Sequence, residues 1–486
     1  MRILVIQLAR LGDIYMTWPV MRALKRTHPQ AEIHLLTRSR FQAAVEGLQE
    51  VDHHHQLNVA GLLEPLLMEE NLEASLGLLQ KKIHTLRGYK FDKIINLSFS
   101  PVSSYLTNAL TTEGAEVRGY SRHPDGTLHI CDENSGYFYS QVGVASANRV
   151  HITDLFAAIA DVDYTVEDWR GPQLEVGSAH VLPEKYAVLH VGASEGHKAP
   201  SVEELSEAIR AYAGIRPDGA VVLVGAENEE TIAAGVQENV SKGNILNLVG
   251  KTKLVETFAL LQDAEVLIGG DSAPLHMAAL TDTCTLNLNK GQVNFYETGP
   301  KAGNAGVLLL EKAQNLRADL EASLRYLLEG VETKPDALVT RSYESIESFA
   351  AVEKQSFEWG LLKAIYLRQP FPVIDSMEVL KGAMELANIN AFAIEQIQLI
   401  PEQGLQLIGP LLDSAEDVIQ KISRLVPELS PMINWYNAEK VRIGPGSTED
   451  ICAATLHVHL RMAHLLEAYV PNETLMQREE VLDGTL

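Results

Sequence analysis

A stretch at residues 264–280, AEVLIGGDSAPLHMAAL, combines features that bind anions. A short apolar run ends at a glycine pair, Asp271 and Ser272 are residue types that cap helices, and Pro274 suits a first helical turn. A strand, a glycine turn and a capped helix in this order present backbone N–H groups and the positive end of a helix dipole. The stretch predicts a nucleotide phosphate site in an α/β sheet. An ordinary strand-to-helix turn has the same local features.

A single carboxylate follows the first apolar run of the chain. Arg2–Gln7 is suited to a central parallel strand, and the sequence LARLGD, ending at Asp13, comes directly after it. In α/β sheets this position lies at the carboxyl ends of the strands, where ligands bind. Two roles are therefore open for Asp13: a general base that accepts a proton from a hydroxyl group, or a cap for the helix that follows.

Other chemical motifs in the chain do not indicate a site. Asp161-Val162-Asp163 spells DxD, a metal–nucleotide motif of another transferase class, but it ends a predicted helix instead of following a strand. The run at residues 53–55, three histidines, could bind metal, but we expect that a run of three cannot converge easily and has no carboxylate or cysteine partner near it. His457, His459 and His464 share one predicted helix and indicate a surface or core role. No G-x-G-x-x-G follows the first strand, which argues against a nicotinamide enzyme. We predict no metal site and no cofactor.

Strand-like and helix-like stretches alternate through the first two thirds of the chain, which predicts doubly wound parallel sheets. The pattern restarts after Gly171-Pro172, and beyond Gly330 amphipathic helices replace the strand-like runs. The predicted domains are therefore 1–170, 171–330 and 331–486. The expected strands are Arg2–Gln7, Ala31–Thr37, Lys93–Leu97, Tyr186–Val191, Ala220–Val224, Val266–Ile268, Thr285–Leu288 and Val307–Leu310.

Length, charge and cysteine content limit the class of protein. A chain of 486 residues is too long for one core. Its net charge of −24 argues against nucleic acid as a partner. Three separated cysteines and no long apolar run predict a cytoplasmic protein without a disulfide framework. Residues 1–45 nevertheless hold seven basic and two acidic side chains, which favours the approach of an anionic small substrate to this segment.

The motifs together resemble glycosyltransferase family 9, the bacterial heptosyltransferases, over about residues 1–330. The 271–279 segment fits the family pattern N/G-D-[ST]-x-x-x-H-x-A-A, and the first 40 residues fit its opening, x-x-x-L-G-D followed by P-x-A-E-I. The resemblance implies the GT-B fold, an α/β architecture with two Rossmann-like domains facing each other across a cleft. Here a C-terminal, mostly α-helical region follows, and this acidic extension lies outside the resemblance.

The resemblance also implies roles for particular residues. Asp13 matches the family's proposed base, Lys198 in HVGASEGHKAP matches a lysine that contacts the donor diphosphate, and Glu229 in GAENEE matches a glutamate that contacts the ribose. From the residues alone, Lys198 is equally a loop lysine and Glu229 an acid at a helix start. Where the family usually shows K-R-W-P, this chain has Lys198-Ala199-Pro200. The remaining substrate-binding positions are Gly12, Ser194, Asp271, Ser272, Ala273 and His276.

By this resemblance the chain is expected to be an inverting, metal-independent glycosyltransferase. The donor would be ADP-heptose and the acceptor a sugar hydroxyl of the lipopolysaccharide core, with peripheral membrane contact. Two alternatives stay open: a transferase acting on a protein acceptor, and a non-catalytic sugar-nucleotide-binding or scaffolding protein. The apolar faces of the helices in 331–486 must also be buried, against their own bundle, the two-domain unit, a second copy or a protein partner.

Overall fold

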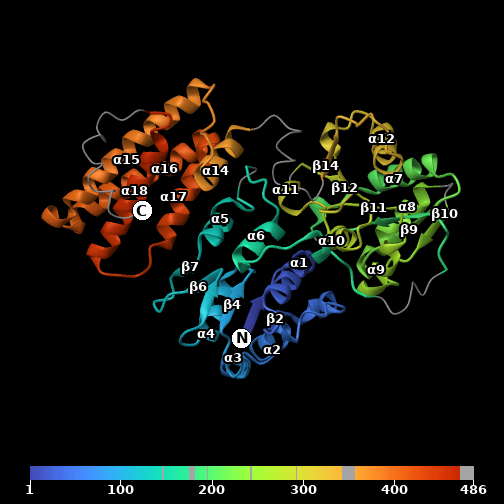
Figure 1. Cartoon of the computed structure of the whole chain (residues 1–486), viewed down its shortest axis with the longest axis horizontal. Coiled ribbons are helices and arrows are strands. Elements are labelled where there is room, and N and C mark those ends of the chain that lie inside the picture. The colour runs from blue at the N-terminus through green and yellow to red at the C-terminus, as the bar shows by residue number, and fades with distance from the viewer. Residues whose placement is uncertain are drawn as a thin grey trace. The chain divides into compact units, whose positions relative to one another are not determined.

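The computed structural model describes residues 1–144, 147–173, 181–193, 195–240, 244–291, 293–341 and 356–470. Its internal contacts divide the chain into two units, whose elements are labelled in Figure 1. Unit 1 consists of the described residues of Met1–Gly119 and Val150–Glu353. Unit 2 consists of those of Tyr120–Arg149 and Lys354–Leu486.

The first sheet of unit 1 has five parallel strands in the order β3-β2-β1-β4-β5. The side chains of β1 at Ile3, Leu4, Val5 and Ile6 are all fully buried, so both faces of this central strand are covered. This is the burial expected of a continuous apolar run. The strands are β1 (Arg2–Ile6), β2 (Glu32–Arg38), β3 (His53–Leu57), β4 (Lys93–Asn96) and β5 (Glu116–Arg118), and the helices of this part are α1 (Leu11–Thr27), α2 (Val59–Glu69), α3 (Leu72–Arg87), α4 (Pro101–Leu110) and α6 (Ile152–Ala160).

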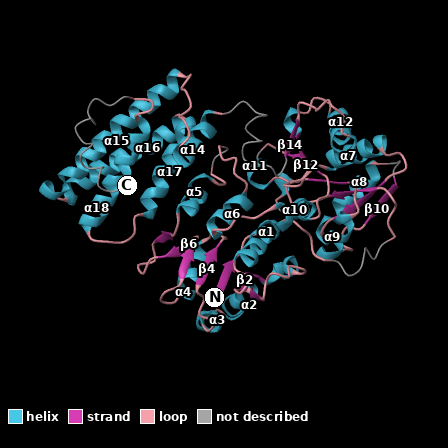
Figure 2. Ribbon diagram, in the orientation of Figure 1, coloured by secondary structure: helices cyan, strands magenta, loops and turns pink. Residues whose placement is uncertain are grey.

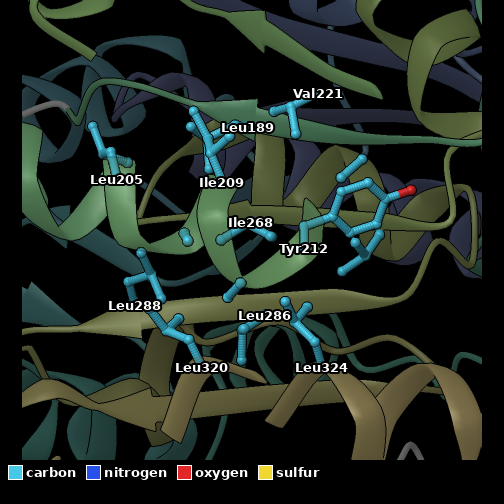
Figure 3. Packing of buried hydrophobic residues seen from close by; sticks show 14 of the residues in the cluster. Leu189, Leu205, Ile209, Tyr212, Val221, Ile268, Leu286, Leu288, Leu320 and Leu324 are labelled. Carbon is cyan, nitrogen blue, oxygen red and sulfur yellow. The ribbon is translucent and has the colours of Figure 1, made fainter. Parts of the chain in front are cut away.

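The second sheet of unit 1 has seven strands in the order β10-β9-β8-β11-β12-β13-β14, parallel except for β14. The strands are β8 (Tyr186–His190), β9 (Ala220–Val224), β10 (Asn244–Asn247), β11 (Val266–Gly269), β12 (Thr285–Asn289), β13 (Ala305–Leu309) and β14 (Leu338–Arg341). The helices are α7 (Val202–Ile215), α8 (Glu230–Asn239), α9 (Leu254–Gln262), α10 (Ala273–Leu280), α11 (Phe295–Thr298) and α12 (Leu316–Glu329). In Figure 3, Leu205, Ile209 and Tyr212 of α7 pack in one apolar cluster with Leu320 and Leu324 of α12.

Unit 2 combines a long C-terminal helical region with a short segment from the middle of the chain. Figure 2 shows the predominance of helix in it. The segment joins the helices through its α5, where Tyr137 packs edge-on against Tyr366 with ring centroids 4.7 Å apart. The Gln141 amide also donates to the Pro431 carbonyl at 3.0 Å. The elements are β6 (Tyr120–Arg122), β7 (Leu128–Ile130), α5 (Glu133–Gln141), α14 (Phe357–Leu367), α15 (Met377–Gln403), α16 (Leu405–Leu425), α17 (Ser430–Arg442) and α18 (Thr448–Leu466).

The α/β fold class with a C-terminal helical region is confirmed, and one local expectation needs correction. Strand-like structure does not end at Gly330, because β14 pairs antiparallel with β13 at the sheet edge. The histidine run begins β3. Residues 61–87, which the sequence predicts to be helical, lie in the two helices α2 and α3, and Glu70 with φ 51° ends the first of them. The domain division at residues 170 and 330 stays a prediction. No described helix is long and apolar enough to cross a membrane.

Candidate active site

The first turn of α1 meets the start of α10, although the two lie far apart in the sequence. A Cβ added at Gly12 would come within 2.9 Å of Cδ2 of His276, so only a glycine allows this approach without a shift of the imidazole. The helices α1 and α10 are in contact and lie together in Figure 1. Farther along α1, Trp18 stacks on Phe258 of α9 with ring centroids 5.6 Å apart. The structure thus brings the LGD and DSAPLH motifs together.

Asp13 lies in the first turn of α1 and is partly buried. Its Oδ2 accepts a hydrogen bond from the backbone N–H of Arg10 at 2.9 Å, so the capping role is present. Desolvation raises the pKa of the Asp13 carboxyl above its ordinary value, and nearby Asp271 adds to this. The hydrogen bond and the charges of Arg10 and Lys198 lower the pKa by less. The carboxylate is therefore a stronger base than a solvated aspartate, and its catalytic role stays a prediction.

Charged side chains connect the turns that follow β1, β8 and β11. The Nζ atom of Lys198 lies 3.3 Å from Oδ2 of Asp271 and 3.9 Å from Oε2 of Glu195. Glu195 also pairs with Arg10, with 2.5 Å between Oε1 and Nη2. Gly270 permits this packing, because a Cβ there would lie 3.0 Å from the Lys198 carbonyl oxygen. Arg10 and Glu195 were not predicted from the sequence, since a single charged loop residue carries no pattern that reveals its partner.

Ser272 occupies the N-cap position of α10 but does not cap it in the expected way. Its hydroxyl lies 3.0 Å from Nδ1 of His190 and 3.2 Å from the Gly270 carbonyl oxygen, and among the described residues it makes no capping hydrogen bond. The prediction that this side chain satisfies the helix start is therefore wrong. In the first turn, which begins at Ala273, Pro274 has no N–H and the N–H of Leu275 donates to the Ser272 carbonyl at 3.1 Å. The positive end of the helix dipole at this start suits an anion.

Glu229 is held rigidly near the ends of β8 and β9. Its Oε2 accepts the backbone N–H of Ala226 at 2.8 Å and lies 3.8 Å from Nε2 of His190. A Cβ added at Gly192 would lie 1.6 Å from Oε1, so the carboxylate occupies the space that this glycine leaves. Burial raises the pKa of Glu229 and lowers the pKa of His190 to about 4, which leaves His190 neutral at pH 7.

Comparison with known proteins identifies the family. A family model described as glycosyltransferase family 9 (heptosyltransferase) matches residues 79–321, half of the chain. The chain belongs to this family. It is 25% identical over 300 residues to lipopolysaccharide heptosyltransferase 3 of Escherichia coli (strain K12), covering 57% of this chain and 79% of that protein. A second Escherichia coli protein of the same name is 24% identical over 302 residues, with 57% and 80% covered.

The fold agrees with a solved structure of the same family. The glycosyl transferase family 9 structure from Veillonella parvula DSM 2008 aligns with a TM-score of 0.50 at 17% identity, covering 68% of this chain and 98% of that one. The two Rossmann-like sheets of unit 1 are accordingly those of a GT-B glycosyltransferase. Lys198, Glu229, Asp271 and His276 lie inside the matched range, whereas Asp13 precedes it.

Other predicted positions of this family 9 glycosyltransferase have different outcomes. Ser194 lies outside the described residues. Asp161 is the C-cap residue of α6, so the DxD sequence does end a helix and does not follow a strand. His459 is a core residue of unit 2, with Nδ1 2.7 Å from Oδ1 of Asn390. The expectation that the histidine run has no carboxylate partner is wrong in three dimensions, because Oε1 of Glu32 lies 2.6 Å from Nε2 of His53.

His190 is a polar group of the site that was not predicted from the sequence. It ends β8 and begins the quoted segment HVGASEGHKAP, so its place directly before a ligand-binding loop was the available signal. Its two ring nitrogens face Ser272 and Glu229, which otherwise belong to separate motifs. The candidate site thus contains a desolvated carboxylate, a paired lysine, a helix start that Ser272 does not cap and a hydrogen-bonded glutamate.

Proposed function

We propose that the protein is an inverting transferase that moves a heptose from ADP-heptose to a sugar hydroxyl of the lipopolysaccharide core. The observation that carries the proposal is the meeting of Gly12-Asp13 with the α10 helix start. This meeting supports the proposal, because the transfer of a sugar from a nucleotide to a hydroxyl requires a proton acceptor next to a site for the diphosphate. The names of the two Escherichia coli relatives support this choice of sugar and acceptor.

In the proposed reaction Asp13 accepts the proton of the acceptor hydroxyl. The acceptor oxygen forms a bond to the anomeric carbon on the face opposite the nucleotide, and the bond from that carbon to the diphosphate oxygen breaks. ADP leaves with the bonding electron pair, and the anomeric configuration is inverted. The transition state resembles an oxocarbenium ion, so a negative carboxylate nearby also stabilises its developing positive charge. The raised pKa of Asp13 supports this role, because it increases the proton affinity of the carboxylate.

The proposed donor site uses the groups around α10. Lys198 and the first turn of α10 offset the negative charge that grows on the departing diphosphate. Lys198 is already paired with Asp271, so this carboxylate aims the ammonium group and competes with the phosphates for it. Glu229 accepts hydrogen bonds from the ribose hydroxyls, for which its fixed carboxylate is suited.

The charge distribution of the chain bears on the choice of acceptor. Residues 1–45 carry more basic than acidic side chains, and this local positive charge would attract an anionic core saccharide although the whole chain has a net charge of −24. Peripheral membrane contact would have to overcome this net charge at an anionic leaflet. Membrane contact, a cytoplasmic location and assembly through residues 331–486 stay predictions.

The test is ADP release from ADP-heptose in the presence of defined acceptors. We expect acceptor-dependent release with an inner-core oligosaccharide, little release without acceptor, and a product whose anomeric configuration, read by NMR, is opposite to that of the donor. Release with an unmodified polypeptide acceptor but not with the oligosaccharide would replace the proposed acceptor by a protein. Saturable binding of ADP-heptose without release to either acceptor would indicate a binding protein and contradict the proposal.

A further inference from the structure

A cluster of imidazole and carboxylate groups lies on one face of the first sheet, on its edge strand β3 and the neighbouring β2. In the parallel register His34 is opposite His53, and Leu36 is opposite His55. Side chains two residues apart on a strand share a face, so Glu32, His34, His53 and His55 lie on the same side of the sheet. The rings of His34 and His53 are stacked with centroids 4.6 Å apart.

Three of these residues converge as metal ligands do. One ligand atom from each of Glu32, His34 and His53 lies within 4.8 Å of the other two. Oε1 of Glu32 is 2.6 Å from Nε2 of His53 and 3.7 Å from Nε2 of His34. Ligands bound tetrahedrally at about 2.0–2.1 Å are roughly 3.3 Å apart, so the spacing needs only small side-chain rotations. Glu32 and His53 are partly exposed, which leaves room for such rotations.

The buried member of the cluster has an unused nitrogen. His34 is fully buried, and its Nε2 has no hydrogen-bond partner among the described residues. Its other nitrogen, Nδ1, lies 2.8 Å from Nε2 of His55. When His34 donates from Nδ1 to His55, its Nε2 presents a lone pair to Glu32 and His53. A buried nitrogen left in this state is costly unless something accepts the lone pair.

The surroundings hold the ligands as metal-site neighbours do. His55 orients His34 through Nδ1, the arrangement that usually fixes a metal-binding imidazole. Arg2 binds the second carboxylate oxygen of Glu32, with 2.9 Å between Nε and Oε2, so Oε1 is left facing the imidazoles.

We propose that Glu32, His34 and His53 bind a divalent transition-metal ion of the zinc class, with water completing the coordination. Two imidazoles and one carboxylate suit such an ion, whereas magnesium and calcium prefer oxygen ligands alone. Glu32 pairs with Arg2 at the amino end of β1, while Asp13 follows the carboxyl end of that strand. The ion therefore lies at the opposite end of the sheet from the transfer site. It fastens the edge strand β3 to β2, and its effect is on stability.

The experiment uses the untagged full-length chain, stripped with a chelator and titrated with Zn²⁺ by calorimetry, together with thermal melting. We expect one Zn²⁺ bound per chain at micromolar or lower Kd and a higher Tm with Zn²⁺ but not with Mg²⁺. His53→Gln and Glu32→Gln, both at partly exposed positions, should each weaken binding at least tenfold. His54→Gln is the matched control, because Nε2 of His54 lies 2.8 Å from the Thr37 hydroxyl and its side chain points to the other face.

Two results would overturn the proposal. One is the absence of stoichiometric Zn²⁺ binding to the wild-type chain, which would leave the cluster as a hydrogen-bonded network. The other is an equal loss of affinity in His53→Gln and His54→Gln, which would place the bound ion elsewhere. Because neither readout involves glycosyl transfer, the result does not depend on the proposed activity.

Discussion

Replacing Gly192 by alanine tests the role of Glu229 without altering Glu229 itself. The added Cβ would lie 1.6 Å from Oε1, whereas ordinary contacts of a Cβ begin near 3.4 Å. The carboxylate therefore has to move by roughly 2 Å, and the 2.8 Å hydrogen bond from Ala226 cannot survive that displacement. A hydrogen bond to a charged group is worth about 1.5–3 kcal/mol. If the same carboxylate holds the ribose, its displacement weakens ADP binding by about 10- to 100-fold.

The assay is calorimetric titration with ADP, paired with thermal melting of the same samples. We expect Gly192→Ala to lower both the Tm and the ADP affinity. Gly196→Ala is the matched control in the same loop, since no described atom lies within 4 Å of a Cβ at that position. In a Glu229→Ala background the added methyl group has no carboxylate to displace, so its cost in Tm should largely disappear while ADP binding stays weak.

Two results would each contradict part of the role given to Glu229. A Gly192→Ala variant with the ADP affinity of Gly196→Ala but a lowered Tm would show that the carboxylate is displaced yet does not hold the nucleotide. A variant with unchanged Tm and unchanged affinity would show that Glu229 is not packed over Gly192 in solution.

Further predictions concern the two charged groups of the proposed mechanism and the extent of the fold. Asp13→Asn should lower kcat by about 10²–10⁴-fold with ADP affinity within a few-fold, and a loss below about threefold would refute the base role. Because the pKa of Asp13 is raised, wild-type kcat should fall as the pH drops through that raised value, and the residual rate of Asp13→Asn should not follow this limb. Lys198→Ala should weaken ADP binding in calorimetry, whereas Lys290→Ala, at a lysine paired with Glu204, should not; equal affinities would leave Lys198 as a loop lysine. A chain ending at Gly330 should be less soluble and less stable than the full chain, because it loses β14 and the helices that cover α5; normal solubility and melting would contradict this.

Much of unit 1 was readable from the sequence because its information is local. Apolar runs such as the one at Arg2–Gln7 are long enough to mark buried parallel strands, and helix patterns fill the intervals between them. The glycine pair and Asp271-Ser272 likewise marked the turn into α10, since a strand, a turn and a helix start follow one another along the chain. The resemblance to family 9 rested on these same short motifs, and the family match confirmed it.

The sequence could not predict the contacts between segments that lie far apart in the chain. Nothing in the sequence around α5 indicates that Tyr137 packs on Tyr366. The four residues of β14 are too few to predict an edge strand from their sequence pattern. Ser272 illustrates the same limit within one residue, because a competing partner, His190, takes the hydroxyl from the helix it would otherwise cap. Long-range pairing depends on the register and packing of whole elements, and only the folded chain determines these.

The histidine run shows the division most clearly. The sequence alone shows that three histidines are consecutive, and consecutive side chains on a strand point to alternating faces. The parallel register of β2 and β3 then decided that His53 meets Glu32 and His34, while His54 meets Thr37 on the other face. A one-residue shift of that register would exchange the two faces and disperse the cluster. The sequence therefore supplied the histidines and the glutamate, and the pairing of the strands decided which of them converge.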